Sequence, residues 1–467
     1  MEAFRNRRLR RPLERAEKRL VAILGVYLCF LPWALGAELP WLQWVSLAIA
    51  ALGFAAALGS PGSGRRLVRF PIFWIGLALL GYIAVQGANP SWRYVQTTTL
   101  WWLVRVRNIP WLPTSIEAPF AKFNAWRQEI VYAAAWLSVC SVWVGVTRRR
   151  SLRILLGVVV GNGLALVGLL AVQRFTGNQR IPWPLTAWTR SNITASFIYE
   201  NHTGAYLGLV AFCAIALALW VFDRDRRALA KSTSAGVLAF GALALIGAVF
   251  FTLSRGAVLT LTISVMLLCA WLMLRQRFLP KLPGANPVLK QTVIALFVVF
   301  ILVVLRYLDF SEIYRRWDAF AEQGRSESSI YSRRLARAAA IGMIEDLGLR
   351  GVGAGCFRHR FPLYVMRFPP IYQGGNLYWE HAHCDWLEIP IELGLAGDLL
   401  VLLGAAWGMA WFARRRILWH PLAVPLLLGC LQTVLHAGFD FPFQCPAILT
   451  TWCVLLALAG RWIELEK

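Results

Sequence analysis

The sequence predicts an all-α integral membrane protein with about twelve transmembrane helices. Hydrophobic residues make up 58% of its 467 residues and charged residues only 15%, and the mean hydropathy is +0.55. A soluble domain cannot bury that much apolar surface. Several apolar runs also exceed the roughly 18 residues that cross a bilayer, and every second connection between them is basic.

The predicted spans follow the apolar runs in order and end where short basic or Gly/Pro-containing segments interrupt them. They cover residues 20–37, 41–59, 71–88, 128–147, 153–173, 203–222, 234–253, 256–274, 291–307, 391–412, 421–438 and 446–462. The chain therefore divides into a basic tail at 1–19, spans within 20–307, a long loop at 308–390 and the last spans within 391–467. We expect one or two helices in the long loop, including an amphipathic segment at 311–323.

Basic residues set the predicted orientation. They gather in the tail before residue 20 and in the connections at 65–66, 148–150, 226–227, 275–277 and 414–416. Arg and Lys in short connections stay on the cytoplasmic side, so both termini are predicted to be cytoplasmic. The connections at 89–127, 174–202, 254–255 and 308–390 then face the outer side.

The charge pattern excludes two other interpretations. The net charge of +24 is spread over short loops, so we interpret it as a sign of membrane orientation. Because these basic residues do not gather on one soluble face, no nucleic-acid partner is expected. The tail is too charged for a signal peptide, and the first apolar run lacks a small-residue cleavage site. Cys356 and Cys384 fall in the outer loop, where a disulfide could form, but two free buried thiols are the preferred interpretation.

The segment 380–390 places two histidines and three acids directly before an apolar span. Ionisable residues at a membrane boundary indicate a functional site. His381 and His383 share a face if the segment is extended and point apart if it is helical; the apolar continuation favours a helix, so only one is expected to face the site. The alternatives are a metal site of His381, His383 and Asp385 and a capping or interfacial histidine.

Three arginines are candidates for binding an anion on the outer side. Arg255 lies between two apolar spans with almost no loop, and Arg333 and Arg337 share one face of an expected helix. Guanidinium groups bind phosphate oxygens in a bidentate manner. The alternatives are an arginine that reaches lipid phosphates and a solvated helix face paired with acids of the same loop.

Weaker candidates lie at other outer ends of spans. Asn201 and His202 open the sixth span, and His436 with Asp440 close the eleventh. The glycine-rich segment 351–355 (GVGAG) lacks the strand and helix context of a dinucleotide site, so we interpret it as a turn.

Taken together, these motifs resemble the O-antigen ligase and O-antigen polymerase superfamily of bacterial envelope glycosyltransferases, over residues 160–460. The resemblance is carried by 201–207 (NHTGAYL), 254–257 (SRGA), 332–333 (SR) with 351–357 (GVGAGCF), and 381–388 (HAHCDWLE), together with the spacing from His383 to Gly394 and Gly397. Cys356 and Cys384 depart from the family pattern, and the amino-terminal third carries no recognised motif. The resemblance implies a GT-C type of fold.

The resemblance further implies that Arg255 and Arg333 bind the diphosphate of a lipid-linked sugar donor and that His383 assists the acceptor. Chemistry agrees, because no nucleotide sugars exist outside the inner membrane and arginines can neutralise a diphosphate leaving group without metal or cofactor. A histidine can take the proton of the attacking hydroxyl. We assign the catalytic role to His383 and substrate binding to Arg255, Arg333, Arg337, His381, Asn201, His202 and Asp440.

The predicted function is therefore metal-independent, inverting glycan transfer from undecaprenyl diphosphate to a glycan or lipid A core acceptor at the periplasmic face of the inner membrane. The alternatives are a repeat-unit polymerase, a protein O-oligosaccharyltransferase and, from another class, a transporter or flippase of an anionic lipid-linked sugar. Transport usually requires broken helices and repeated halves near the membrane midplane, and the sequence shows neither.

Overall fold

The computed structural model describes residues 14–98, 100–177, 193–227, 233–278, 329–348, 350–372, 379–415 and 417–466. The predicted span at 291–307 and the predicted amphipathic segment at 311–323 lie outside these residues. Within them, eight helices are long and apolar enough to cross a membrane. They are α3 (Pro40–Leu58), α5 (Pro71–Ala88), α7 (Arg149–Thr176), α8 (Glu200–Arg227), α9 (Thr233–Phe251), α10 (Arg255–Phe278), α17 (Asp385–Arg414) and α19 (Pro446–Glu464).

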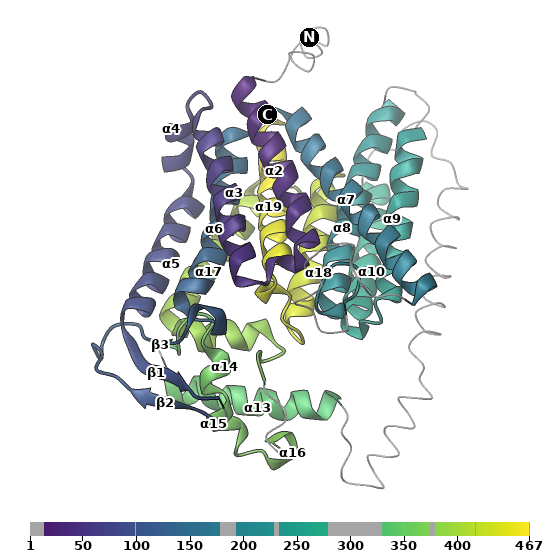
Figure 1. The fold of residues 1–467 in the computed structure, drawn as a ribbon. Coiled ribbons are helices and arrows are strands. Elements are labelled where there is room, and N and C mark those ends of the chain that lie inside the picture. Colours follow the sequence, from purple (N-terminus) through teal and green to yellow (C-terminus); the bar gives the residue numbers. More distant parts are fainter. Residues whose placement is uncertain are drawn as a thin grey trace.

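Three more helices run within the same bundle (Figure 1). They are α2 (Arg15–Trp33), α6 (Ala125–Gly145) and α18 (Ala423–Ala437). Charged residues open α2 and α6, and α18 has only 15 residues. The prediction of a mostly helical membrane protein is confirmed, whereas the number twelve is not.

Local sequence explains where several helices begin. Pro40, Pro71 and Pro446 occupy the first helical position of α3, α5 and α19, where the missing N–H costs no hydrogen bond. Asn124 caps α6 by accepting a hydrogen bond from the backbone N–H of Arg127 at 2.8 Å. Helices α9 and α10 are joined by a tight turn in which Leu253 has a φ of 62°, as the short connection at 254–255 predicted.

The start of α2 and the end of α19 lie at one end of the bundle, and a smaller layer covers the other end (Figure 1). This layer contains α13 (Ser329–Leu347), α14 (Phe357–Arg360), α15 (Pro362–Val365) and α16 (Pro369–Tyr372). Its apolar core, which includes Ala336, Met343, Phe357 and Phe361, is separate from the core of the bundle. The long loop therefore carries more helices than the one or two expected.

A three-stranded sheet in the same layer departs from the all-α prediction. It consists of β1 (Pro90–Gln96), β2 (Trp101–Arg105) and β3 (Ser115–Glu117), with β1 in the centre, antiparallel to β2 and parallel to β3. Its strands are rich in Trp, Tyr and Val, which favour extended backbone. The strands were not predicted because residues 89–127 were interpreted only as a connection between two spans.

The glycine-rich segment 351–355 forms a tight turn that packs on α17. Gly351, Gly353 and Gly355 all have positive φ, a region that favours glycine. The N–H groups of Val352 and Gly353 donate to the carbonyl oxygens of Ile391 and Glu392 at 2.9 Å. The predicted turn is correct, and it fixes α13 and α14 against the helix that follows the histidine segment.

Five short helical segments complete the described elements and connect the longer helices: η1 (Leu35–Ala37), α4 (Ser63–Val68), η2 (Phe120–Lys122), η5 (Ile417–Trp419) and η6 (Pro442–Gln444). Of these, η1, η2 and η6 lie next to the cavity described below, because Glu38, Lys122 and Gln444 line it. The cavity walls therefore come from segments spread over the whole chain.

Candidate functional site

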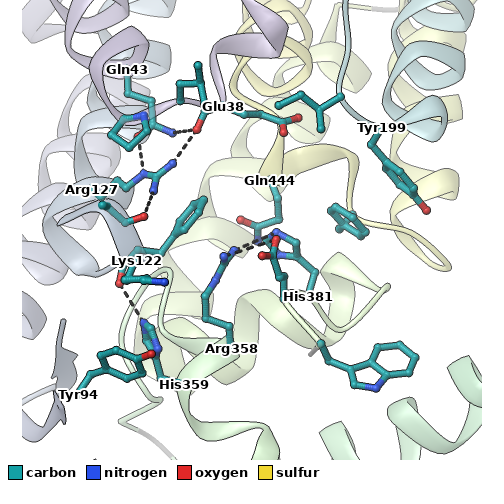
Figure 2. Close-up of a pocket in the computed structure, with 18 of the residues that line it drawn as sticks. Glu38, Gln43, Tyr94, Lys122, Arg127, Tyr199, Arg358, His359, His381 and Gln444 are labelled. Carbon is teal, nitrogen blue, oxygen red and sulfur yellow. Dashed lines mark hydrogen bonds and ion pairs between the residues drawn. The ribbon is translucent and has the colours of Figure 1, made fainter. Parts of the chain in front are cut away.

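A cavity of about 900 Å³ lies where the smaller layer meets the bundle. Its wall combines aromatic side chains with charged and polar ones (Figure 2). The aromatic residues are Tyr94, Trp101, Phe123, Tyr199, Trp379 and Phe441. The ionisable residues are Glu38, Lys122, Arg127, His202, Arg358, His359, Glu380, His381 and His383. A mixed wall of this kind suits a polar ligand that also presents apolar faces.

His383 reaches the cavity from an irregular segment and has strained backbone. Its φ is 50°, which is uncommon for a residue with a Cβ and typical of functional sites. Its Nδ1 is buried and lies 3.5 Å from Oδ1 of Asp440. The side chain is 23% exposed, and no hydrogen bond of Nε2 occurs among the described residues. The ring therefore has one nitrogen against a carboxylate and the other available to a ligand.

Asp440 connects His383 to the other candidates on the bundle side. Its carboxylate accepts hydrogen bonds from Asn201 Nδ2 and from the Tyr199 hydroxyl. Arg333 donates to the same hydroxyl at 3.3 Å. Although burial opposes its ionisation, the nearby His383, His436 and Arg333 lower the pKa of Asp440 to about 2. The carboxylate is therefore charged at neutral pH and can stabilise a protonated His383.

His381 lies against different partners. Its Nδ1 is 2.7 Å from Oε1 of Glu388, and its Nε2 is 3.2 Å from a terminal nitrogen of Arg358 (Figure 2). Because guanidinium only donates, Nε2 accepts and Nδ1 donates to Glu388. Burial, reinforced by Arg358, holds the pKa of His381 well below its ordinary value. Its lone pair is occupied, so His381 is poorly placed to accept a proton.

The helical prediction for the histidine segment is wrong. Helix α17 begins only at Asp385, after His383, and His381 and His383 both line the cavity. Glu388, in the first turn of α17, holds the preceding chain in place by accepting from the N–H group of Ala382, and Asp385 accepts from the N–H group of Phe443 in η6. These backbone bonds compete with helix formation, and the sequence alone did not reveal them.

The candidate arginines lie beside the cavity, outside its lining. Arg333 and Arg337 extend from α13 and donate to the carbonyl oxygens of Phe439 and Gly438 at 3.4 and 2.9 Å. Arg255 opens α10 and is exposed. Among the described residues none of the three forms an ion pair with a carboxylate within 4.0 Å, so their charge remains available to an anion.

Position 256, next to Arg255, is in close contact with the end of α18. A Cβ on Gly256 would lie 2.8 Å from Nε2 of His436, which is 3.8 Å from Oδ2 of Asp440. His436 is buried, and its two ring nitrogens have no hydrogen bond in the part of the chain that the structure describes. The start of α10 and the Asp440 turn are therefore neighbours.

Sequence reasoning missed the cationic wall that comes from the amino-terminal third. Arg127 on α6 is 2% exposed and donates to Gln43 and to the carbonyl oxygens of Ala121 and Glu38 (Figure 2). Its guanidinium lies 3.5 Å from the centre of the Phe123 ring, and that of Arg358 lies 3.7 Å from the same centre. The one sequence signal that could have indicated it was the position of Arg127 directly before the predicted span at 128–147.

The remaining predictions about ligands and thiols have mixed outcomes. Among the described residues, His381, His383 and Asp385 do not bring their ligand atoms together closely enough to hold one metal ion, whereas Glu38, His202 and Cys445 do. Cys356 and Cys384 are free and buried, as preferred. Burial raises the pKa of the Cys356 thiol to about 12 and that of Cys384 above its ordinary value, so neither is a ready nucleophile.

Comparison with known proteins supports the family resemblance. Residues 240–402 match the family model described as O-antigen ligase. The match includes Arg255, Arg333, Arg337, His381 and His383 and excludes Asn201, His202 and Asp440, which only the fold brings to the same place. No curated protein matches the chain. Within this multi-pass membrane protein, residues 240–402 are therefore similar to the O-antigen ligase family.

Proposed function

We propose that this protein is an inverting, metal-independent glycosyltransferase that moves a glycan from undecaprenyl diphosphate to an acceptor hydroxyl. The O-antigen ligase domain supports a function of the ligase or polymerase type. The observation that carries the finer proposal is the continuous set of contacts from His383 through Asp440 and Tyr199 to Arg333. It joins a possible base to a cation of the kind that a diphosphate leaving group needs.

His383 acts as the general base in this proposal. Its Nε2 takes the proton from the acceptor hydroxyl while the hydroxyl oxygen bonds to the anomeric carbon of the donor. Asp440, 3.5 Å from Nδ1, orients the ring and stabilises the imidazolium that forms. The geometry favours His383 over His381, whose Nε2 already accepts from Arg358. A positioned base of this type contributes roughly 10²–10⁴-fold in rate.

The bond from the anomeric carbon to the diphosphate oxygen breaks on the opposite face of the sugar, so the anomeric configuration inverts. Undecaprenyl diphosphate leaves with the electron pair of that bond. Arg333 and Arg337, held on α13 by neutral carbonyl oxygens, and Arg255 supply the positive charge that stabilises it. Asn201 keeps the Asp440 carboxylate in place, and His202 forms part of the cavity wall.

The aromatic wall supports a glycan as the occupant of the cavity. Tyr199 stacks on Phe441 with ring centres 5.2 Å apart, and Tyr94 stacks on Trp101 at 5.6 Å. Aromatic side chains offer rigid apolar surface, and the charged groups between them can bind hydroxyls. A cavity of about 900 Å³ is large enough for more than one sugar.

We place the site at the periplasmic face of the inner membrane. The basic connections predict that the end of the bundle formed by the start of α2 and the end of α19 is cytoplasmic. The smaller layer lies at the opposite end (Figure 1), and Tyr94, Arg358 and His359 of that layer line the cavity. Membrane lipids then surround the bundle, and the donor reaches the arginines from the outer leaflet.

Transfer from a purified undecaprenyl diphosphate glycan tests the proposal. Wild type is compared with His383→Ala, Arg333→Ala and Arg255→Ala in EDTA, with Arg334→Ala as matched control because Arg334 is exposed on the same helix. We expect transfer by wild type and the control, and loss in the other three. Lipid A core, a lipid-linked repeat and a protein hydroxyl are offered as acceptors. Failure of wild type with all acceptors would refute the proposal.

A further inference from the structure

A second group of potential ligands adjoins the cavity, which two of its members, Glu38 and His202, line. The carboxylate of Glu38, the imidazole of His202 and the thiol of Cys445 each place a ligand atom within 4.8 Å of the other two. They come from the turn between α2 and α3, the start of α8, and the residue before α19. These segments are far apart in the sequence, so no spacing motif predicts the group.

Hydrogen bonding fixes how His202 faces this group. Its Nε2 lies 3.3 Å from the carbonyl oxygen of Phe441, and because a carbonyl only accepts, Nε2 carries a proton. Nδ1 then faces Oε1 of Glu38 at 2.9 Å. Two lone pairs cannot face each other at that distance, so a proton or a metal cation must lie between them. A carbonyl partner on the second ring nitrogen is the usual arrangement for a metal-ligating histidine.

The group is also held rigidly and largely shielded from solvent. The imidazole of His202 packs edge-on against the stacked rings of Tyr199 and Phe441, and the centre of each ring is 5.1 Å away. Side-chain exposure is 4% for His202 and 23% for Glu38, and Cys445 is fully buried. A Cβ on Gly36 would lie 2.9 Å from Sγ of Cys445, so the turn that carries Glu38 can approach the thiol only because glycine is there.

We propose that Glu38, His202 and Cys445 bind one divalent transition-metal ion of the Zn²⁺ type. Thiolate, imidazole and carboxylate together form a ligand set that Zn²⁺ accepts. On binding, the proton of the Cys445 thiol and any proton on His202 Nδ1 are released to solvent, and the sulfur and the nitrogen each donate a lone pair to the ion. The ion fastens three segments of the cavity wall, and the transfer chemistry at His383 does not pass through it.

Cobalt binding to the purified full-length protein in detergent tests this inference without any transfer assay. After chelation, Co²⁺ is titrated and the thiolate-to-cobalt charge-transfer absorption is followed in the near ultraviolet. We expect one equivalent to bind, with Zn²⁺ displacing it and raising the melting temperature. Cys445→Ser should abolish the band. Cys453→Ser, the same substitution on α19 itself, should retain it, because Cys453 belongs to no ligand group among the described residues.

His202→Gln supplies a second, independent readout, because it should weaken Co²⁺ binding at least about tenfold while leaving the thiol in place. Absence of stoichiometric binding in wild type would overturn the inference and identify the contact as a proton-bridged histidine–glutamate pair. A band of wild-type strength in Cys445→Ser would overturn it as well. If chelation lowers the melting temperature, and transfer still occurs at temperatures below this lowered value, the result would support both a bound structural ion and metal-independent transfer.

Discussion

Replacing Asp440 by Asn probes the electrostatic contact on which the proposed base depends. The substitution keeps the size of the side chain and its place in the turn, but it removes the negative charge 3.5 Å from His383 Nδ1. Protonation of His383 during transfer then leaves an imidazolium with no carboxylate beside it. We expect a lower kcat, with little change in the donor affinity set by the arginines of α13.

The size of the effect follows from the distance and the burial. Two unit charges 3.5 Å apart interact by about 4.7 kcal/mol at an effective dielectric constant of about 20. His383 is 23% exposed, so solvent screens part of this, and we take roughly half, about 2–3 kcal/mol. Because about 1.4 kcal/mol corresponds to a factor of ten in rate, kcat should fall roughly 10²-fold.

Initial rates of transfer from a fluorescent lipid-linked glycan give the measurement, with donor concentration varied to separate kcat from KM. Asp346→Asn is the matched control, since Asp346 is an exposed carboxylate on α13. A kcat of Asp440→Asn within about threefold of wild type, in a preparation where His383→Ala is inactive, would show that Asp440 does not assist His383. Equal loss of thermal stability in both Asp variants would point to a structural effect instead.

Four further outcomes can be measured on the same preparations. The folded pKa of Asp440 is about 2 against about 3.9 unfolded, so its stabilisation is present above pH 4 or so and is lost as the pH falls towards 2; Asp440→Asn should flatten this acid limb of the melting temperature. Arg333→Gln should raise KM for the donor by about 10–100-fold, as expected for a lost charge-assisted contact; an unchanged KM contradicts the assignment. His381→Gln, whose amide can still donate to Glu388 and accept from Arg358, should lose at most about tenfold, whereas His383→Gln should lose about 10²–10⁴-fold; the reverse order would make His381 the base. Gly353→Ala should destabilise the protein by about 1–3 kcal/mol, because its φ is +100° and a Cβ would lie 2.4 Å from the side chain of Ser115; an unchanged melting temperature would refute this.

Much of the helical bundle could be predicted because the length of each apolar run can be read directly from the local sequence. The runs at 41–59 and 71–88 agree with α3 and α5 to within a residue or two. The sheet at 90–117 and the irregular backbone at His381 and His383 could not be predicted in this way. Their conformation depends on partners distant in the sequence, such as β3 for β1 and Asp440 for His383.

The sequence by itself determined that this is a helical membrane protein and identified residues that carry the family pattern, because hydropathy and motif residues are local properties of the chain. Only the tertiary structure decided which residues meet. It placed His383 beside Asp440 and gave the lone pair of His381 a hydrogen bond from Arg358. It also brought Glu38 and Arg127, from a region without recognised motifs, to the cavity. Contacts of this kind depend on how helices distant in the sequence pack, and no spacing along the chain encodes them.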